Sequence, residues 1–318
     1  MKGKKRTDIT KRLLERLYIK EKLSMYKVAK ELNTTYITVW KKIKKYDIKV
    51  RTISEANTKY PKPLFSGNLK EKAYMLGLRY GDISAKRNGR QVMVYTSTTH
   101  LAQVKMFQSV FEKYTHRIYC YIGSTPKNMA AWKISCKLHE SFDYMLVKSN
   151  KIPKWIIENN KFFYAFLASY ADCEGNWDIG KQSESKNNRV RFRIKSGDKD
   201  ILEQIKNRLE KLKFRVTFRL ERLAVKYGYN KDIYCLQINY KNDVIRLAKI
   251  LLNLSCHMEK ICKMKLILEN SGKSWEETED KIENFRNWMK KSRLDNNIFI
   301  SPLHSTLRAM RVEDECSQ

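Results

Sequence analysis

Phe166-Leu-Ala-Ser-Tyr-Ala-Asp-Cys-Glu-Gly175 indicates the architecture of this chain, because Tyr74-Met-Leu-Gly-Leu-Arg-Tyr-Gly-Asp-Ile83 has the same pattern of residue types. Both stretches are rich in apolar and small residues, and each carries an acid at its end, Glu174 in one and Asp82 in the other. If two such helices pack side by side about a pseudo-two-fold axis, both carboxylates arrive at the same end of the pair.

Small residues stand at matched places in the two stretches. Gly77 and Gly81 are four positions apart, and so are Ser169 and Cys173. A spacing of four puts each pair on one face of a helix. Small side chains on that face let two helix backbones approach closely, so the pattern predicts that the two helices are in direct contact.

The chain repeats itself once from residue 68 onward, at low identity. Each copy opens with a helix, at residues 69–81 and 161–173, and continues with a basic hairpin, an amphipathic helix, a second hairpin and another helix. The amphipathic helices are expected at residues 100–114 and 199–212. Two αββαββα units predict an α+β fold with pseudo-two-fold symmetry, with halves at residues 68–158 and 159–270. Residues 271–318 are expected to form a further helix and a tail without an assigned function.

The first fifty residues predict a small all-α unit. Apolar residues recur at helical spacing over residues 9–23, Ser24 is placed to cap a helix over residues 25–32, and a basic helix follows over residues 36–45. A tight turn before a basic helix is typical of a helix-turn-helix DNA-binding domain, here residues 1–50, with residues 51–67 as a linker. The groove-facing candidates are Thr35, Tyr36, Thr38 and Lys42. The alternative is a three-helix bundle with a solvated basic face.

The two helical motifs resemble those of the LAGLIDADG homing endonucleases, in the form with two motifs in one chain. The resemblance covers residues 68–270, and the second motif fits the pattern best, at Leu167, Ala168, Asp172, Glu174 and Gly175. The first motif departs from it, with Tyr80 where an acid is usual and Ile83 in place of the last glycine.

The resemblance implies a site-specific endonuclease of intron homing that cuts both strands of a long DNA site. It implies that Asp82 and Glu174 hold Mg²⁺ or Mn²⁺ at the centre of the DNA, and that a basic residue assists each site. Lys260 is the candidate in the second half. In the first half, Lys148 or Lys151 could serve, and Lys148 is the choice.

The chemistry suits these residue types. A phosphodiester is cut by an activated water attacking in line, and hard cations take few carboxylates while keeping water and phosphate oxygens. Two neighbouring carboxylates in a basic protein therefore favour a cation site. The alternative is that Asp82 and Glu174 only end two core helices, but an acid at a helix C-terminus opposes the helix dipole.

The predicted hairpins alternate apolar and polar residues, which sends one set to the core and the other to an outer face. The outer set is nearly all positive, with glutamine and asparagine, and such side chains suit base edges in the major groove. The DNA-binding candidates are Arg189, Arg191, Arg193, Lys195, Arg215, Arg219, Gln237, Lys133 and Lys137.

Bulk composition agrees with a nucleic-acid partner. The formal charge is +31, spread along the chain, and neutralising about ten phosphates would make binding steeply salt-dependent. No apolar run is long enough for a membrane span. Seven scattered cysteines without a Cys-x-x-Cys pair indicate free thiols in the cytoplasm. We expect a monomer that binds double-stranded DNA. Two alternatives on the same scaffold are a non-cleaving transcription regulator and an intron RNA maturase.

Overall fold

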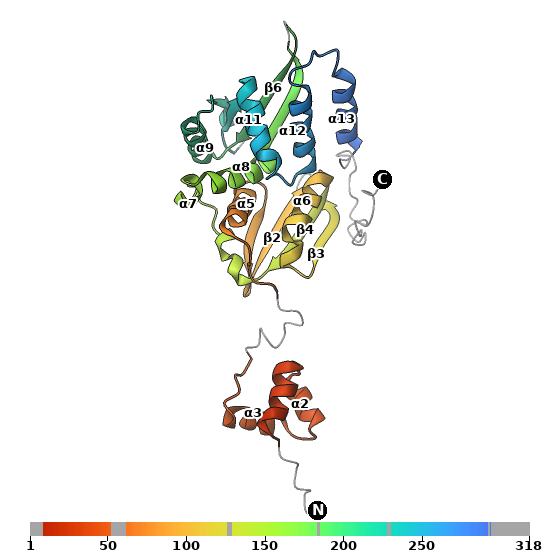
Figure 1. Cartoon of the computed structure of the whole chain (residues 1–318). Coiled ribbons are helices and arrows are strands. Elements are labelled where there is room, and N and C mark those ends of the chain that lie inside the picture. The colour runs from red at the N-terminus through yellow and green to blue at the C-terminus, as the bar shows by residue number, and fades with distance from the viewer. Residues whose placement is uncertain are drawn as a thin grey trace, which may run out of the picture. The chain divides into compact units, whose positions relative to one another are not determined.

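The computed structural model describes residues 9–51, 62–125, 129–182, 185–227, 230–291 and 293. Contacts divide the chain into two compact units, residues 1–61 and residues 62–318 (Figure 1). Each unit has a hydrophobic core of its own. No helix within the described residues is both long and apolar enough to cross a membrane.

The N-terminal unit consists of short helices around a small apolar core. Its elements are α1 (Lys11–Leu14), the π-helical turn η1 (Glu15–Lys20), α2 (Met25–Glu31) and α3 (Tyr36–Lys45). The hydroxyl of Ser24 accepts from the backbone N–H of Lys27 at 3.2 Å, which confirms the predicted cap. The helix expected over residues 9–23 is instead an α-helical turn followed by a π-helical one. It ends before Lys22, whose φ of +51° does not continue a helix.

The larger unit contains the predicted repeat. The first half runs α5 (Leu69–Tyr80), β1 (Ser84–Asn88), β2 (Gln91–Thr98), α6 (Leu101–Phe111), η2 (Glu112–Tyr114), β3 (Ile118–Ser124), β4 (Ala130–Leu138), η3 (Glu140–Met145) and α7 (Lys154–Ile157). The second runs α8 (Asn160–Glu174), β5 (Gly175–Gln182), β6 (Ser185–Ser196), α9 (Lys199–Lys211), β7 (Thr217–Arg222), α10 (Ala224–Tyr227), β8 (Ile233–Ile238), α11 (Lys241–Leu252), α12 (Met258–Asn270) and α13 (Glu279–Lys291).

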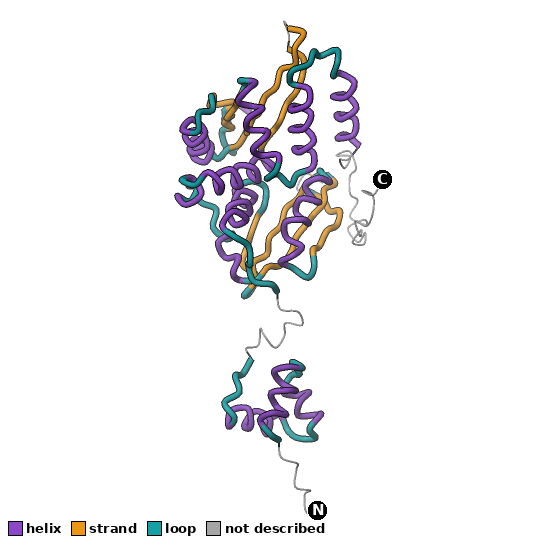
Figure 2. The backbone as a smooth tube through the Cα atoms, viewed as in Figure 1, coloured by secondary structure: helices purple, strands orange, loops and turns teal. Residues whose placement is uncertain are grey.

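Each half carries one four-stranded antiparallel sheet (Figure 2). The strand order is β1-β2-β4-β3 in the first sheet and β5-β6-β8-β7 in the second, so the two halves share one topology. Helix α6 packs on β2 and β4, while α9 and α11 contact the second sheet. This architecture confirms the α+β prediction with two matching halves.

The core of the larger unit is continuous across both halves. Alternate residues of the strands point into it, such as Val92 and Val94 on β2 and Phe192 and Ile194 on β6, all fully buried. Helices α5 and α8 pack against each other between the two sheets. The period-two pattern therefore leaves the other face of each sheet for polar residues.

The further helix expected within residues 271–318 is α13, which begins at Glu279. The segment before it is anchored on β6 by Asn188, whose buried side-chain amide donates to the carbonyl of Asn270 at 3.1 Å and to the hydroxyl of Thr278 at 2.8 Å. These bonds fix the C-terminal segment to the second sheet.

Candidate active site

Helices α5 and α8 pack so closely that their backbones are almost in contact. A Cβ atom added at Gly77 would lie 1.9 Å from Oγ of Ser169, and one added at Gly81 would lie 2.5 Å from Cβ of Cys173. Both distances are shorter than any real Cβ contact, so neither glycine can carry a side chain without moving the helices. This confirms the close contact that the small residues predicted, at both matched positions.

The two acids stand directly after the second of these contacts. Gly81 precedes Asp82, and Cys173, which Gly81 faces, precedes Glu174. Glu174 is the last residue of α8, while Asp82 lies in the turn beyond α5. The packing of the helices thus brings both acids to the same end of the pair.

Asp82 is exposed and held from one side. Its Oδ2 accepts a hydrogen bond of 2.8 Å from Nε2 of Gln103, and its main-chain oxygen accepts from the hydroxyl of Thr96 at 3.1 Å. Gln103 is itself buried in α6. The carboxylate is therefore oriented by a fixed neighbour and remains open to solvent.

Glu174 is partly buried, and its pKa is raised to about 7. Burial is the main cause and the negative charge of Asp82 the second, while the positive charges of Lys148 and Lys260 act in the opposite direction. The ionised form of Glu174 is thus costly in the protein alone. A cation placed between the two carboxylates would remove that cost.

Lys260 lies on α12 with its ammonium group buried against the site. Its Nζ donates to the main-chain oxygen of Gly175, the residue after Glu174. Burial lowers the pKa of Lys260. Lys263, one turn later, donates to Oδ1 of Asn176 at 3.1 Å, and burial lowers its pKa to about 8. Of these two ammonium groups, that of Lys260 acts on Glu174.

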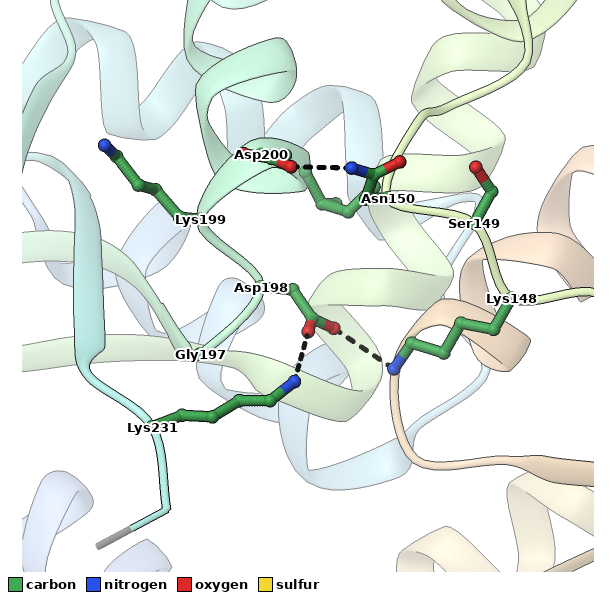
Figure 3. Close-up of a pocket in the computed structure, with 9 residues that line it drawn as sticks. Lys148, Ser149, Asn150, Gly197, Asp198, Lys199, Asp200 and Lys231 are labelled. Atoms are coloured by element: carbon green, nitrogen blue, oxygen red, sulfur yellow. Dashed lines mark hydrogen bonds and ion pairs between the residues drawn. The ribbon is translucent and has the colours of Figure 1, made fainter. Parts of the chain in front are cut away.

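Lys148 reaches the site from the end of the first half. Its Nζ lies 3.1 Å from Oδ2 of Asp198, the N-cap residue of α9. Lys231 approaches the other oxygen of Asp198 at 3.7 Å, so the carboxylate lies between two ammonium groups (Figure 3). Lys151, the other first-half candidate, is exposed, and its main-chain oxygen accepts from the hydroxyl of Tyr80 at 2.8 Å. Of the two, only Lys148 is among the charges that shift Glu174.

The sequence reading missed Gln103 and Asp198. Gln103 stands among apolar residues of α6, and a lone amide on a buried helical face was the available signal. Asp198 follows a strand and precedes a helix, which predicts a cap and nothing more. Neither signal identifies the partner, because Asp82 and Lys148 lie far away in sequence.

The other acid of the second motif has a structural role. Asp172 is buried, and its Oδ2 accepts from the hydroxyl of Tyr74 at 2.8 Å and from the backbone N–H of Cys256 at 2.9 Å. Burial raises its pKa to about 6. In the first motif the matching Tyr80 donates to the oxygen of Lys151. Each motif helix is therefore hydrogen-bonded to the segment at the end of its half. Asp172 accepts this bond in the second half, and Tyr80 donates it in the first.

The outer face of the second sheet is less positive than its strands alone suggested. Asp178 on β5 lies 2.6 Å from Arg191 and 3.7 Å from Arg189, both on β6. Glu221 on β7 pairs with Lys195 and with Arg219, the latter at 3.1 Å. The expectation of a nearly all-positive face was wrong here, because β5 and β7 contribute one acid each to the face.

Three further DNA-binding candidates of the second half differ in how freely their side chains could contact DNA. Arg215 lies before β7, which begins at Thr217, and its guanidinium pairs with Asp243 at 2.9 Å and lies over the ring of Tyr240. Gln237 is only 6% exposed, so it cannot touch a base edge as it stands. Arg193 is partly exposed, beside Gln237 in the register of β6 and β8. We therefore leave Gln237 out of the proposed surface.

The outer face of the first sheet combines lysines and tyrosines. Lys133 and Lys137 on β4 are partly exposed, as their alternation predicted. Tyr95, Tyr119 and Tyr121 on the neighbouring strands are each more than a third exposed, and the register sets Tyr121 opposite Lys133. This face offers ring surfaces where the second sheet offers guanidinium groups.

In the N-terminal unit, all four groove-facing candidates have contacts within the unit. The hydroxyl of Thr35 caps α3, accepting from the backbone N–H of Thr38 at 3.2 Å. The ammonium of Lys42 lies over the ring of Tyr46, 5.6 Å from its centre. Tyr36 is exposed and stacks on Tyr26, with ring centres 4.6 Å apart.

The donor set near the acid pair fits a hard divalent cation. It consists of the carboxylate oxygens of Asp82 and Glu174. Within the described ranges, three or more His, Cys, Asp or Glu side chains nowhere gather closely enough to form a complete metal site. Two carboxylates suit Mg²⁺, which keeps several waters and takes its other ligands from a substrate phosphate.

Comparisons with known proteins give one family model and several similar solved structures. Residues 162–251 match the family model described as a LAGLIDADG-like domain. Among solved structures, the homing endonuclease I-WcaI bound to its DNA recognition sequence is similar at 19% identity, over 71% of this chain and 97% of that one, with a TM-score of 0.45. I-DmoI in complex with DNA and Ca is similar at 18% identity, over 58% and 91%, with a TM-score of 0.40. No curated protein matches.

Proposed function

We propose that the protein is a DNA endonuclease that hydrolyses a phosphodiester bond in each strand of a long duplex site. Its residues 162–251 match the family model of a LAGLIDADG-like domain. The observation that carries the proposal is the position of two acids. Asp82 and Glu174 follow the contacting residues Gly81 and Cys173, and the charge of Asp82 acts on Glu174.

The two carboxylates would hold Mg²⁺ or Mn²⁺. When bound, a divalent cation supplies Lewis acidity toward the phosphate and toward water. The hydrogen bond from Gln103 keeps the carboxylate of Asp82 in one orientation. A fixed ligand loses little freedom when a cation binds, so Gln103 supports the site without contacting the phosphate.

The ammonium groups of Lys260 and Lys148 would offset negative charge that grows on the phosphate as its bond to the leaving oxygen breaks. Both already act on Glu174. Because Lys260 is buried and Lys148 is tied to Asp198, neither group has to be ordered when DNA arrives.

The outer faces of the two sheets would bind the duplex. Arg189, Arg191, Arg193, Lys195 and Arg219 are the proposed contacts of the second sheet, and Lys133 and Lys137 those of the first. Asp178 and Glu221 fix four of the five basic groups in place. A guanidinium held by a carboxylate is oriented for paired hydrogen bonds with guanine. Arg215 fits a phosphate contact beyond the strand.

The N-terminal unit would add a second DNA contact. Helix α3 follows a tight turn at Asn33 and carries four lysines and no acid. A basic helix after such a turn suits the major groove. This contact would lengthen the recognised site beyond what the larger unit covers.

The proposal is tested by selecting cleaved duplexes from a random library with Mg²⁺. Wild-type protein should yield a single long site. Asp82→Asn and Glu174→Gln should bind that site and cut it at least about 1,000-fold more slowly, since metal ligation contributes several kcal/mol to such barriers. Glu203→Gln is the matched control, because Glu203 is a partly exposed acid of α9 that pairs with Lys199, four residues before it.

Three outcomes of that selection are informative. Cleavage by wild type and by the control, with binding alone by the two variants, supports the proposal. Binding without cleavage by every protein would indicate a DNA-binding regulator instead. Preference for a structured RNA over every duplex in the library would indicate a maturase.

A further inference from the structure

Helix α3 leaves two large apolar side chains in solvent. Ile37 is 61% exposed and Trp40 is 43% exposed. Val39 and Ile43, on the other side of the helix, are fully buried against α1, η1 and α2. The exposed pair is therefore not part of the core of the N-terminal unit, although it lies on a helix of only ten residues.

The exposed apolar surface continues beyond this pair. Tyr36 stacks on Tyr26, the rings lying at an angle of 19°, and Tyr26 is 72% exposed. We call the surface of Tyr26, Tyr36, Ile37 and Trp40 the apolar patch. Single exposed apolar residues are common, but neighbouring ones on a small unit mark a contact surface.

Lysines surround the apolar patch. Lys41 and Lys44 stand next to Ile37 and Trp40 on the outer side of α3, one turn further along, and both are exposed. Lys27 is exposed beside Tyr26 on α2. No acid interrupts this side of α3. The partner must therefore present negative charge on either side of apolar groups.

Double-stranded DNA has this arrangement in its major groove. Phosphates line the groove, and the 5-methyl groups of thymine are the apolar groups on its floor. The groove admits one helix, and α3 begins at a tight turn that lets its first residues enter. Thr35 and Lys42 are already engaged within the unit, so the outer residues of α3 are better placed to read bases.

We infer that α3 reads thymine methyl groups: Ile37 and Trp40 pack on them while Lys41 and Lys44 bind the adjoining phosphates. The ligand class is a thymine-containing segment of duplex DNA next to the site of the larger unit. The inference rests on the proposed DNA binding but not on cleavage, so Asp82→Asn can be used throughout.

Uracil interference tests the inference directly, because uracil lacks only the 5-methyl group of thymine. Duplexes selected from a random library by the full-length Asp82→Asn protein are made again with uracil replacing about one thymine per molecule. Bound and free molecules are separated, and uracil positions are mapped in each. We expect one cluster of positions where uracil lowers binding by about fourfold per methyl, the value of one buried methylene-sized group.

Variants assign that cluster to α3. Ile37→Ser and Trp40→Ser should remove the uracil effect and leave the rest of the protected site unchanged. Ile19→Ser is the matched control, since Ile19 is 41% exposed on η1 and outside the apolar patch, and it should keep the effect. Circular dichroism melting of each variant checks that the N-terminal unit stays folded.

Several results would overturn the inference. A selected site without uracil-sensitive positions, or with an effect that survives Ile37→Ser and Trp40→Ser, leaves the endonuclease proposal intact and removes this one. Ile37-dependent binding to vesicles of anionic phosphatidylserine, with no uracil effect on DNA, would make the apolar patch a membrane contact. Failure to select any duplex would remove both proposals.

Discussion

The hydroxyl of Tyr74 on α5 donates a hydrogen bond of 2.8 Å to Oδ2 of Asp172 on α8. The same oxygen accepts from the backbone N–H of Cys256, just before α12. One buried carboxylate thus connects the two motif helices to the helix that carries Lys260. The relationship explains why an acid that does not face the cation site is present in the second motif.

Removing this hydrogen bond should weaken the helix contact. Tyr74→Phe removes one donor from the buried carboxylate of Asp172, which should lower the free energy of unfolding by about 1–3 kcal/mol. Urea denaturation followed by circular dichroism measures the change. Tyr144→Phe is the control, because the Tyr144 hydroxyl donates to a weak acceptor, the sulfur of Met75 at 3.2 Å, and its loss should cost little. Equal effects of the two variants would count against the role of Asp172.

The backbone contact at Gly77 should not tolerate a methyl group. Gly77→Ala places Cβ against Oγ of Ser169 and the main-chain oxygen of Phe166, which lies 2.4 Å from the added atom. Forcing the helices apart should destabilise the protein by about 1–3 kcal/mol or more and displace the acids. Gly272→Ala adds a methyl group in open space and serves as the control. Thermal melting compares them, and wild-type stability in Gly77→Ala would contradict the close packing.

Stability should depend on the ionisation of Glu174. Burial raises its pKa to about 7 in the folded protein, above the ordinary 4.5 of the unfolded chain. A group with a raised carboxyl pKa binds its proton more tightly when folded, so its contribution to stability is lost as pH rises from about 4.5 to about 7. Thermal melts across this range should show a decline in wild type that Glu174→Gln reduces.

Mg²⁺ should reverse that decline, since a cation that binds the folded protein raises its melting temperature. The gain should appear above pH 7 in wild type and be absent in Glu174→Gln. A gain of the same size in both proteins would place the cation elsewhere.

Asp198 should act on cleavage mainly by holding Lys148, although its charge also raises the pKa of Glu174. Asp198→Asn removes the carboxylate that holds the ammonium at 3.1 Å, and cleavage should fall by about tenfold, the rate equivalent of 1.4 kcal/mol, while DNA affinity changes little. Asp200→Asn is the matched control, because Asp200 accepts from Asn150 and contacts no lysine of the site (Figure 3).

A double-mutant cycle separates positioning from a general structural effect. In a Lys148→Met background, Asp198→Asn should cause no further loss of cleavage. An additional tenfold loss in that background would mean that Asp198 works independently of Lys148.

The parts of the site that were predictable from sequence are those set by residues near one another in the chain. Gly77 and Gly81 mark the helix face that contacts α8, and Asp82 directly follows Gly81, so its position is set by the same contact. Strand alternation predicted the outward Lys133 and Lys137 for the same reason. These patterns depend on helical and strand periods alone.

The remainder depends on which strands and segments become neighbours. Asp178 meets Arg191 because β5 pairs with β6, and Gln237 is covered in the middle of a sheet whose register no single strand reveals. Ile37 and Trp40 lie on one side of α3, yet the residues buried in the core are Val39 and Ile43 on the other side. Each outcome was decided by tertiary packing between residues that are distant in sequence.

The position of Mn²⁺ in crystals of the full-length protein with its selected duplex, located by anomalous scattering, tests directly whether the two acids hold the cation. We expect a peak within direct coordination distance of carboxylate oxygens of both Asp82 and Glu174, next to a DNA phosphate. A peak that touches neither carboxylate, or DNA bound with no cation at the end of α5 and α8, would contradict it.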